Sequence, residues 1–110
     1  MSPSSAPSRR RGTNMVYDEE SDLIILFGGK CDEGAILGDT WTFDVNSNTW
    51  TNMSPATAPE ARRWQYMTYD SKSDLVILFG GFTGSLSLDD TWTYDVDTNT
   101  WTEMSHRTPL

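Results

Sequence analysis

The chain has 110 residues and a formal net charge of −8, so it has the length of one domain and is acidic. This charge argues against general nucleic-acid binding and against contact with an anionic membrane surface. The sequence lacks an apolar stretch near the roughly 20 residues of a membrane span. No apolar run follows the basic cluster at 9–11 as a secretory signal requires, so we expect a soluble chain and assign no compartment. The single cysteine, Cys31, excludes an internal disulfide.

One pattern occurs twice along the chain. Five apolar residues, Leu23–Phe27, lie between Ser-Asp and a diglycine, and the same arrangement surrounds Leu75–Phe79. Phe79 lies 52 residues after Phe27, and further on the spacing between matching residues falls to 51. A period of this length indicates a repeat protein in which each repeat is one supersecondary unit.

Each repeat contains four short runs typical of β-strands, and helical periodicity is absent. The expected strands are Gly12–Tyr17, Leu23–Phe27, Thr40–Phe43 and Thr49–Met53, then Trp64–Tyr69, Leu75–Phe79, Thr91–Tyr94 and Thr100–Met104. The second strand of each set is apolar on both faces, which predicts a central place in its sheet. We expect the diglycine to end that strand.

The connections differ in length and composition. Residues 18–22, 44–48, 70–74 and 95–99 are short and rich in Asp, Asn and Ser, which predicts tight hairpin turns at one end of each sheet. The segments 30–38 and 82–89 differ by one residue, which predicts surface loops at the other end. The arginines that precede the first strand of each repeat belong to this loop-rich end.

The repeat resembles the kelch motif of β-propellers. The similarity rests on the diglycines, on an aromatic residue in the third strand, on a tryptophan seven residues later, on Asp-Thr-Trp before that aromatic, and on an arginine near the first strand. These residues are Gly28, Gly29, Gly80, Gly81, Phe43, Tyr94, Trp50, Trp101, Trp41, Trp92, Arg10 and Arg62. Where kelch repeats often carry Gly-His, this chain has Gly12-Thr13 and Trp64-Gln65. The resemblance implies an all-β fold of two four-stranded blades.

The expected domains are one blade over 1–52, a second blade over 53–103, and the start of a further repeat or a tail over 104–110. Two blades cannot close a propeller, and they leave apolar faces uncovered. We therefore expect head-to-tail association of identical chains, with a six-bladed trimer favoured, an eight-bladed tetramer second and a four-bladed dimer third. The ends of the chain fall at repeat boundaries, which also suits a designed or excised repeat unit.

The candidate ligand-binding residues are Arg10, Arg11, Arg62, Arg63 and Trp64. In a closed ring these arginines would surround the channel, and guanidinium groups bind carboxylate and phosphate through paired hydrogen bonds. The alternative is that Arg10 and Arg62 pair with Asp39 or Asp90 and serve the fold alone. Lys30, Ile36, Leu37 and either Leu86 or Leu88 are further loop-face residues suited to contact a partner. The alternative is that the leucines pack against the adjacent blade.

We expect no metal site, cofactor or catalytic residue. The segment Asp95-Val-Asp-Thr-Asn99 begins like a calcium loop, but it lacks the glycine and distal glutamate and is explained as a turn. Cys31 is flanked by Asp32 and is interpreted as incidental.

The sequence favours a non-catalytic, self-assembling scaffold or binding module. Its partners are other copies of itself and either a protein segment, such as an acidic peptide, or a small anion, held through an arginine ring. One alternative is a purely structural repeat unit whose only activity is assembly. Another is an enzyme whose active site forms across the assembled ring.

Overall fold

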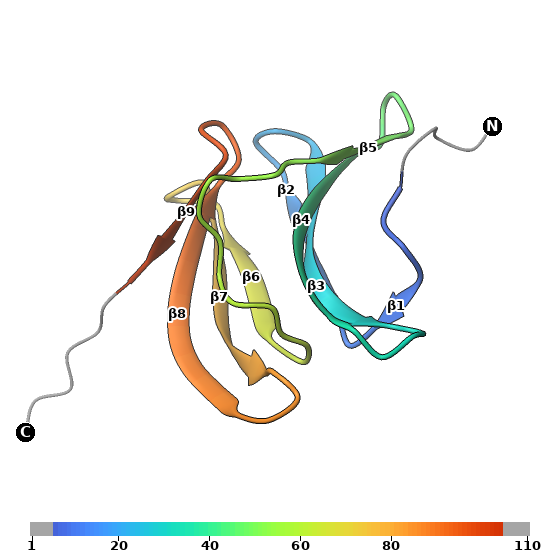
Figure 1. The fold of residues 1–110 in the computed structure, drawn as a ribbon. Coiled ribbons are helices and arrows are strands. Elements are labelled where there is room, and N and C mark those ends of the chain that lie inside the picture. The colour runs from blue at the N-terminus through green and yellow to red at the C-terminus, as the bar shows by residue number, and fades with distance from the viewer. Residues whose placement is uncertain (1–5, 105–110) are drawn as a thin grey trace, which may run out of the picture.

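The computed structural model describes residues 6–104, which form nine β-strands in two sheets (Figure 1). The first sheet contains β1 (Arg10–Arg11), β2 (Asn14–Asp18), β3 (Leu23–Cys31), β4 (Ile36–Asp44) and β5 (Thr49–Asn52). The second contains β6 (Tyr66–Asp70), β7 (Leu75–Phe82), β8 (Ser87–Asp95) and β9 (Thr100–Glu103). The expected tail at 104–110 lies, except for Met104, outside the described residues.

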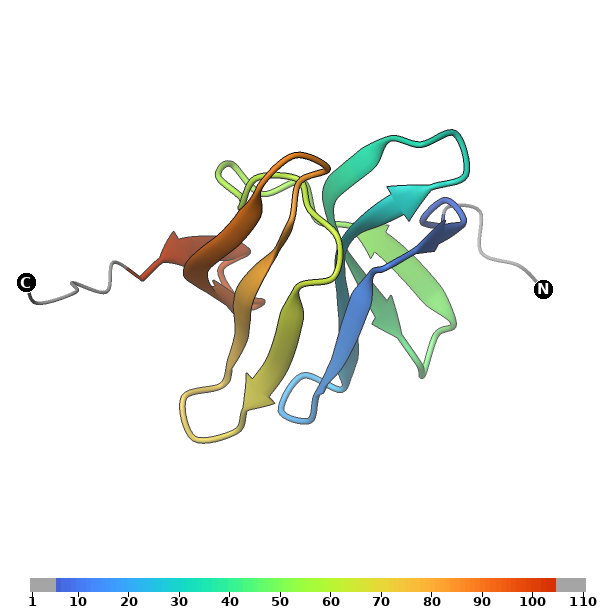
Figure 2. The ribbon, with the colours of Figure 1, turned by 90° about the horizontal axis from the view of Figure 1, so that it is seen from below.

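Both sheets are antiparallel, with neighbouring strands joined in chain order. In the second sheet the order is β6-β7-β8-β9, and in the first it is β3-β4-β5 with β1 and β2 both paired to β3. The strands predicted to be central are therefore central, because β3 and β7 each have hydrogen-bonded neighbours on both sides. The all-β prediction is confirmed, and the two sheets stand side by side as propeller blades do (Figure 2).

The prediction that the diglycine ends the second strand is wrong. β3 continues through Gly28 and Gly29 to Cys31, and β7 continues likewise to Phe82. Pairing between β3 and β4 slips at the diglycine and resumes at Gly29 opposite Leu37, which is a β-bulge. Gly28 has φ of 70°, and a Cβ there would lie 2.5 Å from the carbonyl oxygen of Arg62. The glycines thus let the strand continue and let the next blade approach closely.

The connections at the loop-rich end are therefore shorter than predicted. Only residues 32–35 and 83–86 connect the strands there, so Lys30, Ile36, Leu37 and Leu88 lie in strands and not in loops. Of the loop-face residues proposed from the sequence, Leu86 is in a connection, with 63% of its surface exposed.

The first strand of each repeat also differs from its prediction. In the first repeat it is divided into β1 and β2, because Gly12 has φ of 71°. In the second repeat β6 begins at Tyr66, because Trp64 takes the same left-handed conformation with φ of 64°. A tryptophan rarely adopts such a backbone conformation, which makes Trp64 a strained position.

The core lies between the two sheets. Ile25 and Phe27 of the first sheet are completely buried against a cluster from the second sheet. The members of that cluster are Val76, Leu78, Trp92, Tyr94 and Trp101. In Figures 1 and 2, β2 and β6 lie next to each other, so the two blades contact along their first strands and across their facing surfaces. The blades are stabilised mainly by this aromatic and aliphatic interface.

Candidate functional site

Two arginines hold the ends of their own blades in equivalent ways. Arg10 Nη1 donates to Asp39 Oδ1 at 2.6 Å, and Arg62 Nη1 donates to Asp90 Oδ1 at 2.6 Å. The second nitrogen of each guanidinium reaches the other carboxylate oxygen, so both pairs are bidentate. The side chain of Arg62 is completely buried, and that of Arg10 is 4% exposed. The structural role that the sequence left open for Arg10 and Arg62 is thus present.

These ion pairs shift the pKa of the carboxyl groups. The hydrogen bond from Arg62 lowers the pKa of Asp90, and it outweighs burial, which acts in the opposite direction. At Asp39 burial is the largest influence and raises the pKa. Hydrogen bonds from Arg10 and Trp41 overcome it, so the net pKa of Asp39 is also lowered.

The lowered pKa of Asp90 predicts acid sensitivity. Because the folded-state pKa lies below the unfolded-state value, the pair's stabilisation is present above the unfolded pKa, about pH 4, and is lost as the pH falls through the folded pKa. We expect Asp90→Asn to be less stable than the parent at neutral pH and to lose less further stability on acidification. Urea unfolding across this pH range measures the difference, with Asp97→Asn in an exposed turn as control. Equal pH slopes for parent and Asp90→Asn would contradict the prediction.

A different arrangement surrounds Arg63. Its guanidinium carbon lies 3.9 Å from the centre of the Trp64 ring and 5.8 Å from that of Phe82. The two rings are themselves stacked, with centroids 5.7 Å apart and an interplanar angle of 20°. The paired backbone hydrogen bonds between Arg63 and Phe82 fix this geometry. The Trp64 amide donates to the Gly12 carbonyl of the first blade at 2.7 Å, so the cluster lies at the junction of the blades.

Arg63 has unused binding capacity. Within residues 6–104 it forms no ion pair, so its terminal Nη atoms are the donors that a ligand would contact. Its Nε also has no hydrogen-bond partner, but this atom is buried and out of reach of a ligand. A guanidinium with open donors beside an exposed tryptophan is a binding arrangement for an anionic group with an apolar part. Trp64 is 59% exposed, so its ring is accessible.

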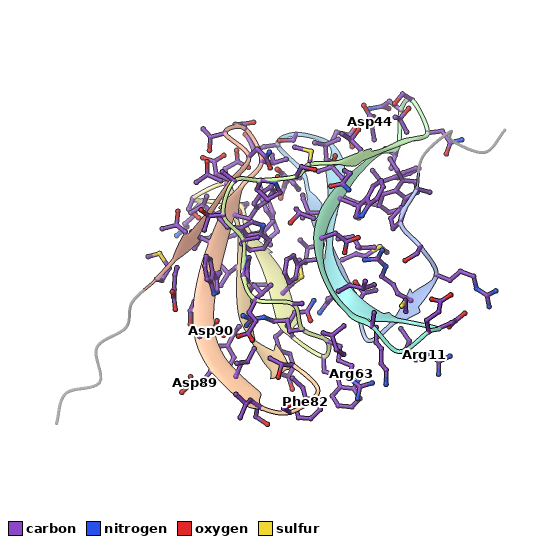
Figure 3. All side chains as sticks on the ribbon, in the orientation of Figure 1. Arg11, Asp44, Arg63, Phe82, Asp89 and Asp90 are labelled. Atoms are coloured by element: carbon purple, nitrogen blue, oxygen red, sulfur yellow. The ribbon has the colours of Figure 1, made fainter. Side chains whose placement is uncertain are left out.

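Further cations lie around Arg63. A shallow pocket beside it is lined by Arg11, Lys30, Cys31, Asp32, Glu33, Gly34 and Arg63. Arg11 is 78% exposed in its side chain and forms an ion pair at 3.7 Å with Asp32, and solvent weakens this attraction because both side chains are exposed. We call the group Arg11, Lys30, Arg63, Trp64 and Phe82 the basic-aromatic face. In Figure 3, Arg11, Arg63 and Phe82 lie at the end of the blades opposite Asp44.

The structure therefore divides the five candidate residues. It brings Arg63 and Trp64 together and places Arg11 nearby, whereas Arg10 and Arg62 are held by aspartates. Phe82 was missed as a site residue although its counterpart in the first repeat, Lys30, was selected, because the two residues differ in type and the repeat does not mark their position. In the structure Phe82 pairs with Arg63 across the strands. This pairing could have been inferred from the sequence, because Arg63 precedes the first strand of the repeat and Phe82 directly follows the diglycine of the neighbouring second strand.

The described part of the chain holds no group of three or more His, Cys, Asp or Glu side chains placed to bind a metal ion. Across residues 6–104 there is also no helix long and apolar enough to cross a membrane. The turn at Asp95 is a hairpin in which the Asp95 side chain accepts a hydrogen bond from the Asp97 amide. This is how an aspartate stabilises such a turn.

Comparison with known proteins identifies the family. The KLHDC2/KLHL20/DRC7 Kelch-repeats domain matches residues 2–109, nearly the whole chain. The chain belongs to the Kelch-repeat family. The predicted kelch resemblance is confirmed, and the diglycine bulges and the arginine-aspartate pairs described above are elements of the chain's two Kelch repeats.

Several relatives share this repeat region. Mei4-dependent protein 6 of Schizosaccharomyces pombe is 28% identical over 92% of the chain, and Kelch domain-containing protein 2 of Bos taurus is 34% identical over 74%. Dynein regulatory complex subunit 7 of Chlamydomonas reinhardtii is 36% identical over 68%. The chain spans only 15%, 20% and 6% of the lengths of these three relatives, respectively. Kelch-repeat domains are in general non-catalytic and act as protein-binding scaffolds.

Proposed function

We propose that the chain is a non-catalytic binding module whose basic-aromatic face takes up an acidic segment of a partner protein. The observation that carries this proposal is the guanidinium of Arg63, which forms no ion pair within residues 6–104 and lies over the Trp64 ring, beside Phe82, at the junction of the blades. A carboxylate of the partner would accept hydrogen bonds from Arg63, while an adjacent apolar group would cover the exposed ring of Trp64. A small anion alone would use the first contact without the second.

The distribution of charge over the chain supports an acidic partner. The chain as a whole is acidic, whereas at this end Arg11, Lys30 and Arg63 outnumber the two carboxylates of the same pocket, Asp32 and Glu33. A local basic site on an acidic protein selects against general polyanions, which the remaining surface repels, and admits a short acidic segment. The proposal does not use Arg10 or Arg62, because their donors are already held by Asp39 and Asp90.

Titration with a short poly-glutamate peptide, small enough to contact the basic-aromatic face alone, and separately with sodium sulfate, tests this function. We expect the parent to bind poly-glutamate and Arg63→Ala to bind it at least about tenfold more weakly, since a hydrogen bond to a charged group contributes roughly 1.5–3 kcal/mol. Lys72→Ala removes the same charge from the β6–β7 turn at the opposite end of the blade and should leave binding unchanged.

Calorimetry measures the binding. Equal losses for Arg63→Ala and Lys72→Ala would show a general charge effect and contradict the proposed site. Binding of sulfate as tight as that of poly-glutamate would favour the small anion over the peptide.

Assembly as the only activity is the second candidate, and one observation favours it. Phe79, which is equivalent to the buried Phe27, is 43% exposed on the outer face of the second blade. Exposed aromatic surface on a blade face is the feature that association with another blade would cover. Under this alternative the chain keeps its oligomeric mass and binds neither poly-glutamate nor sulfate.

A further inference from the structure

The junction between the two blades is a specific set of contacts. The indole N–H of Trp101 in β9 donates to Thr40 Oγ1 in β4 at 3.0 Å. The same ring meets Phe27 of β3 edge to face, with centroids 5.2 Å apart. All three side chains are buried, with Phe27 at 0%, Thr40 at 1% and Trp101 at 3% exposure. One face of the first blade thus receives a tryptophan that the second blade provides.

The repeat places the same residue types on the two outer faces. Phe79 and Thr91 of the second blade are equivalent to Phe27 and Thr40, and they lie on the face directed away from the first blade. Trp50 is equivalent to Trp101 and belongs to β5 of the first blade. The chain therefore carries a second receiving face and a second tryptophan to enter it. Within one molecule these two cannot meet, because they lie on opposite outer sides.

The exposure of neighbouring residues supports the same reading. In the second blade, Met67 and Tyr69 pack against the core cluster between the blades. Their equivalents in the first blade, Met15 and Tyr17, are 50% and 51% exposed. The first blade thus presents uncovered the residue types that the second blade uses to contact its neighbour. The equivalent methionines and tyrosines indicate one type of contact. The second blade forms it with the first blade, and the first blade presents the equivalent residues for a further contact.

Backbone hydrogen bonds at the junction can also be repeated. The Arg62 amide donates to the Leu37 carbonyl at 3.0 Å, and the Gly29 amide donates to the Arg62 carbonyl at 2.8 Å. The equivalent positions are Arg10, Leu88 and Gly81. Because these bonds need only the backbone and a glycine that permits close approach, the outer faces are able to form them as well.

We infer that the outer face of the second blade, centred on Phe79 and Thr91, receives the first blade of a second copy of this chain through Trp50. The contact is head-to-tail, because the surface that donates differs from the surface that receives. Such contacts continue from copy to copy until the rotation closes a ring. The inference rests on the self-association proposed above, but not on assembly being the only activity. It gives that association a defined interface and is independent of ligand binding at the basic-aromatic face.

One contact of the internal junction is missing from the copy-to-copy junction. Gln65 Nε2 donates across the blades to the Phe27 carbonyl at 2.7 Å. The equivalent residue is Thr13, whose hydroxyl donates to the same Phe27 carbonyl within its own blade. We therefore expect the contact between copies to be weaker than the contact within the chain and the assembly to depend on protein concentration.

Complementation between two variants tests the inference. Phe79→Glu places a charge on the receiving face, and Met15→Glu places one on the donating face. Both side chains are about half exposed, so the fold should tolerate the changes, which circular dichroism verifies. By analytical ultracentrifugation we expect the parent to exceed its 12.4 kDa chain mass, with a trimer of three chains favoured, and each variant alone to be monomeric. The equimolar mixture should form a dimer and stop there, because each variant retains the face that the other lacks.

Thr102→Glu is the matched control. It adds the same charge at an exposed site on β9. The equivalent residue in the first blade, Thr51, stays exposed although the second blade packs against that face of the first blade. We therefore expect Thr102→Glu to assemble like the parent. A monomeric parent would overturn the inference. The outer face of the second blade would then be assigned to a blade of a different protein or to a further blade of a longer chain. A mixture of the two variants that remains monomeric would overturn the head-to-tail geometry. Phe79→Glu should still bind poly-glutamate, so failure of assembly and failure of ligand binding are distinguishable.

Discussion

Replacing Arg62 with alanine is expected to lower the free energy of unfolding by about 3 kcal/mol or more, because it leaves the Asp90 carboxylate without its partner. The guanidinium is completely buried and bonds both oxygens of Asp90, the Gly80 carbonyl and the Glu60 carbonyl. Arg62→Lys should recover only part of the loss, because one ammonium group cannot replace this planar set of donors. Urea unfolding at neutral pH measures both changes.

The reason for the loss is testable by a double variant. Arg62→Ala combined with Asp90→Asn leaves no unpaired carboxylate, so it should be less destabilised than the sum of the two single changes. Asparagine also retains an oxygen for the indole N–H of Trp92, which Asp90 accepts at 2.9 Å. Arg9→Ala, at a side chain with 92% exposure, is the control and should change stability by less than about 0.5 kcal/mol. Additive single effects would contradict the unpaired-charge explanation.

The sequence indicates that Arg62 pairs with Asp90, but it does not indicate that the pair is buried. The repeat places an arginine and an aspartate at matching distances in both blades, and opposite charges in matching places indicate a pair. Its burial depends on the Gly80 carbonyl and on the strand that continues past the diglycine. The sequence does not predict that continuation, so it places the arginine at the loop-rich end without indicating that its side chain is completely buried.

The error at the diglycine has a tertiary cause. Two glycines after an apolar run are typical of a strand end when only the local sequence is considered. Here the Gly29 amide donates to the Arg62 carbonyl, which belongs to the next blade. A contact between residues this far apart leaves no mark in the local pattern. The central strands were predictable because their apolar character on both faces is a local property.

The candidate site was predictable in part for the same reason. Arg63 and Trp64 are adjacent in sequence and were both selected, but their stacking with Phe82 depends on the left-handed backbone at Trp64. Nothing local predicts φ of 64° at a tryptophan. The equivalent position, Gly12, has φ of 71°, so the fold imposes this conformation on both repeats. The alignment of the two repeats sets Trp64 against Gly12, at a position where kelch repeats often carry glycine, and this is the sequence signal for the left-handed conformation.

Replacing Trp101 with alanine should have an effect of similar size, a loss of about 3–5 kcal/mol in the free energy of unfolding. Trp101 is 3% exposed, packs against Phe27 and Tyr94, and donates its indole N–H to Thr40. Its removal opens a cavity in the core between the blades. Trp101→Phe keeps most of the ring and should cost only about 1–3 kcal/mol, for the unsatisfied hydroxyl of Thr40 and the lost volume.

Trp50 provides the internal comparison. It packs on Phe43 and Trp41 of its own blade and is partly exposed, so Trp50→Ala should destabilise an isolated chain by less than Trp101→Ala. The monomeric Phe79→Glu background is where this difference is measured, by urea unfolding of both substitutions. In the parent background the inferred association would make Trp50 a junction residue like Trp101, so we expect the two substitutions to become more similar in effect as protein concentration rises. A difference that does not change with concentration would mean that Trp50 never enters a blade contact.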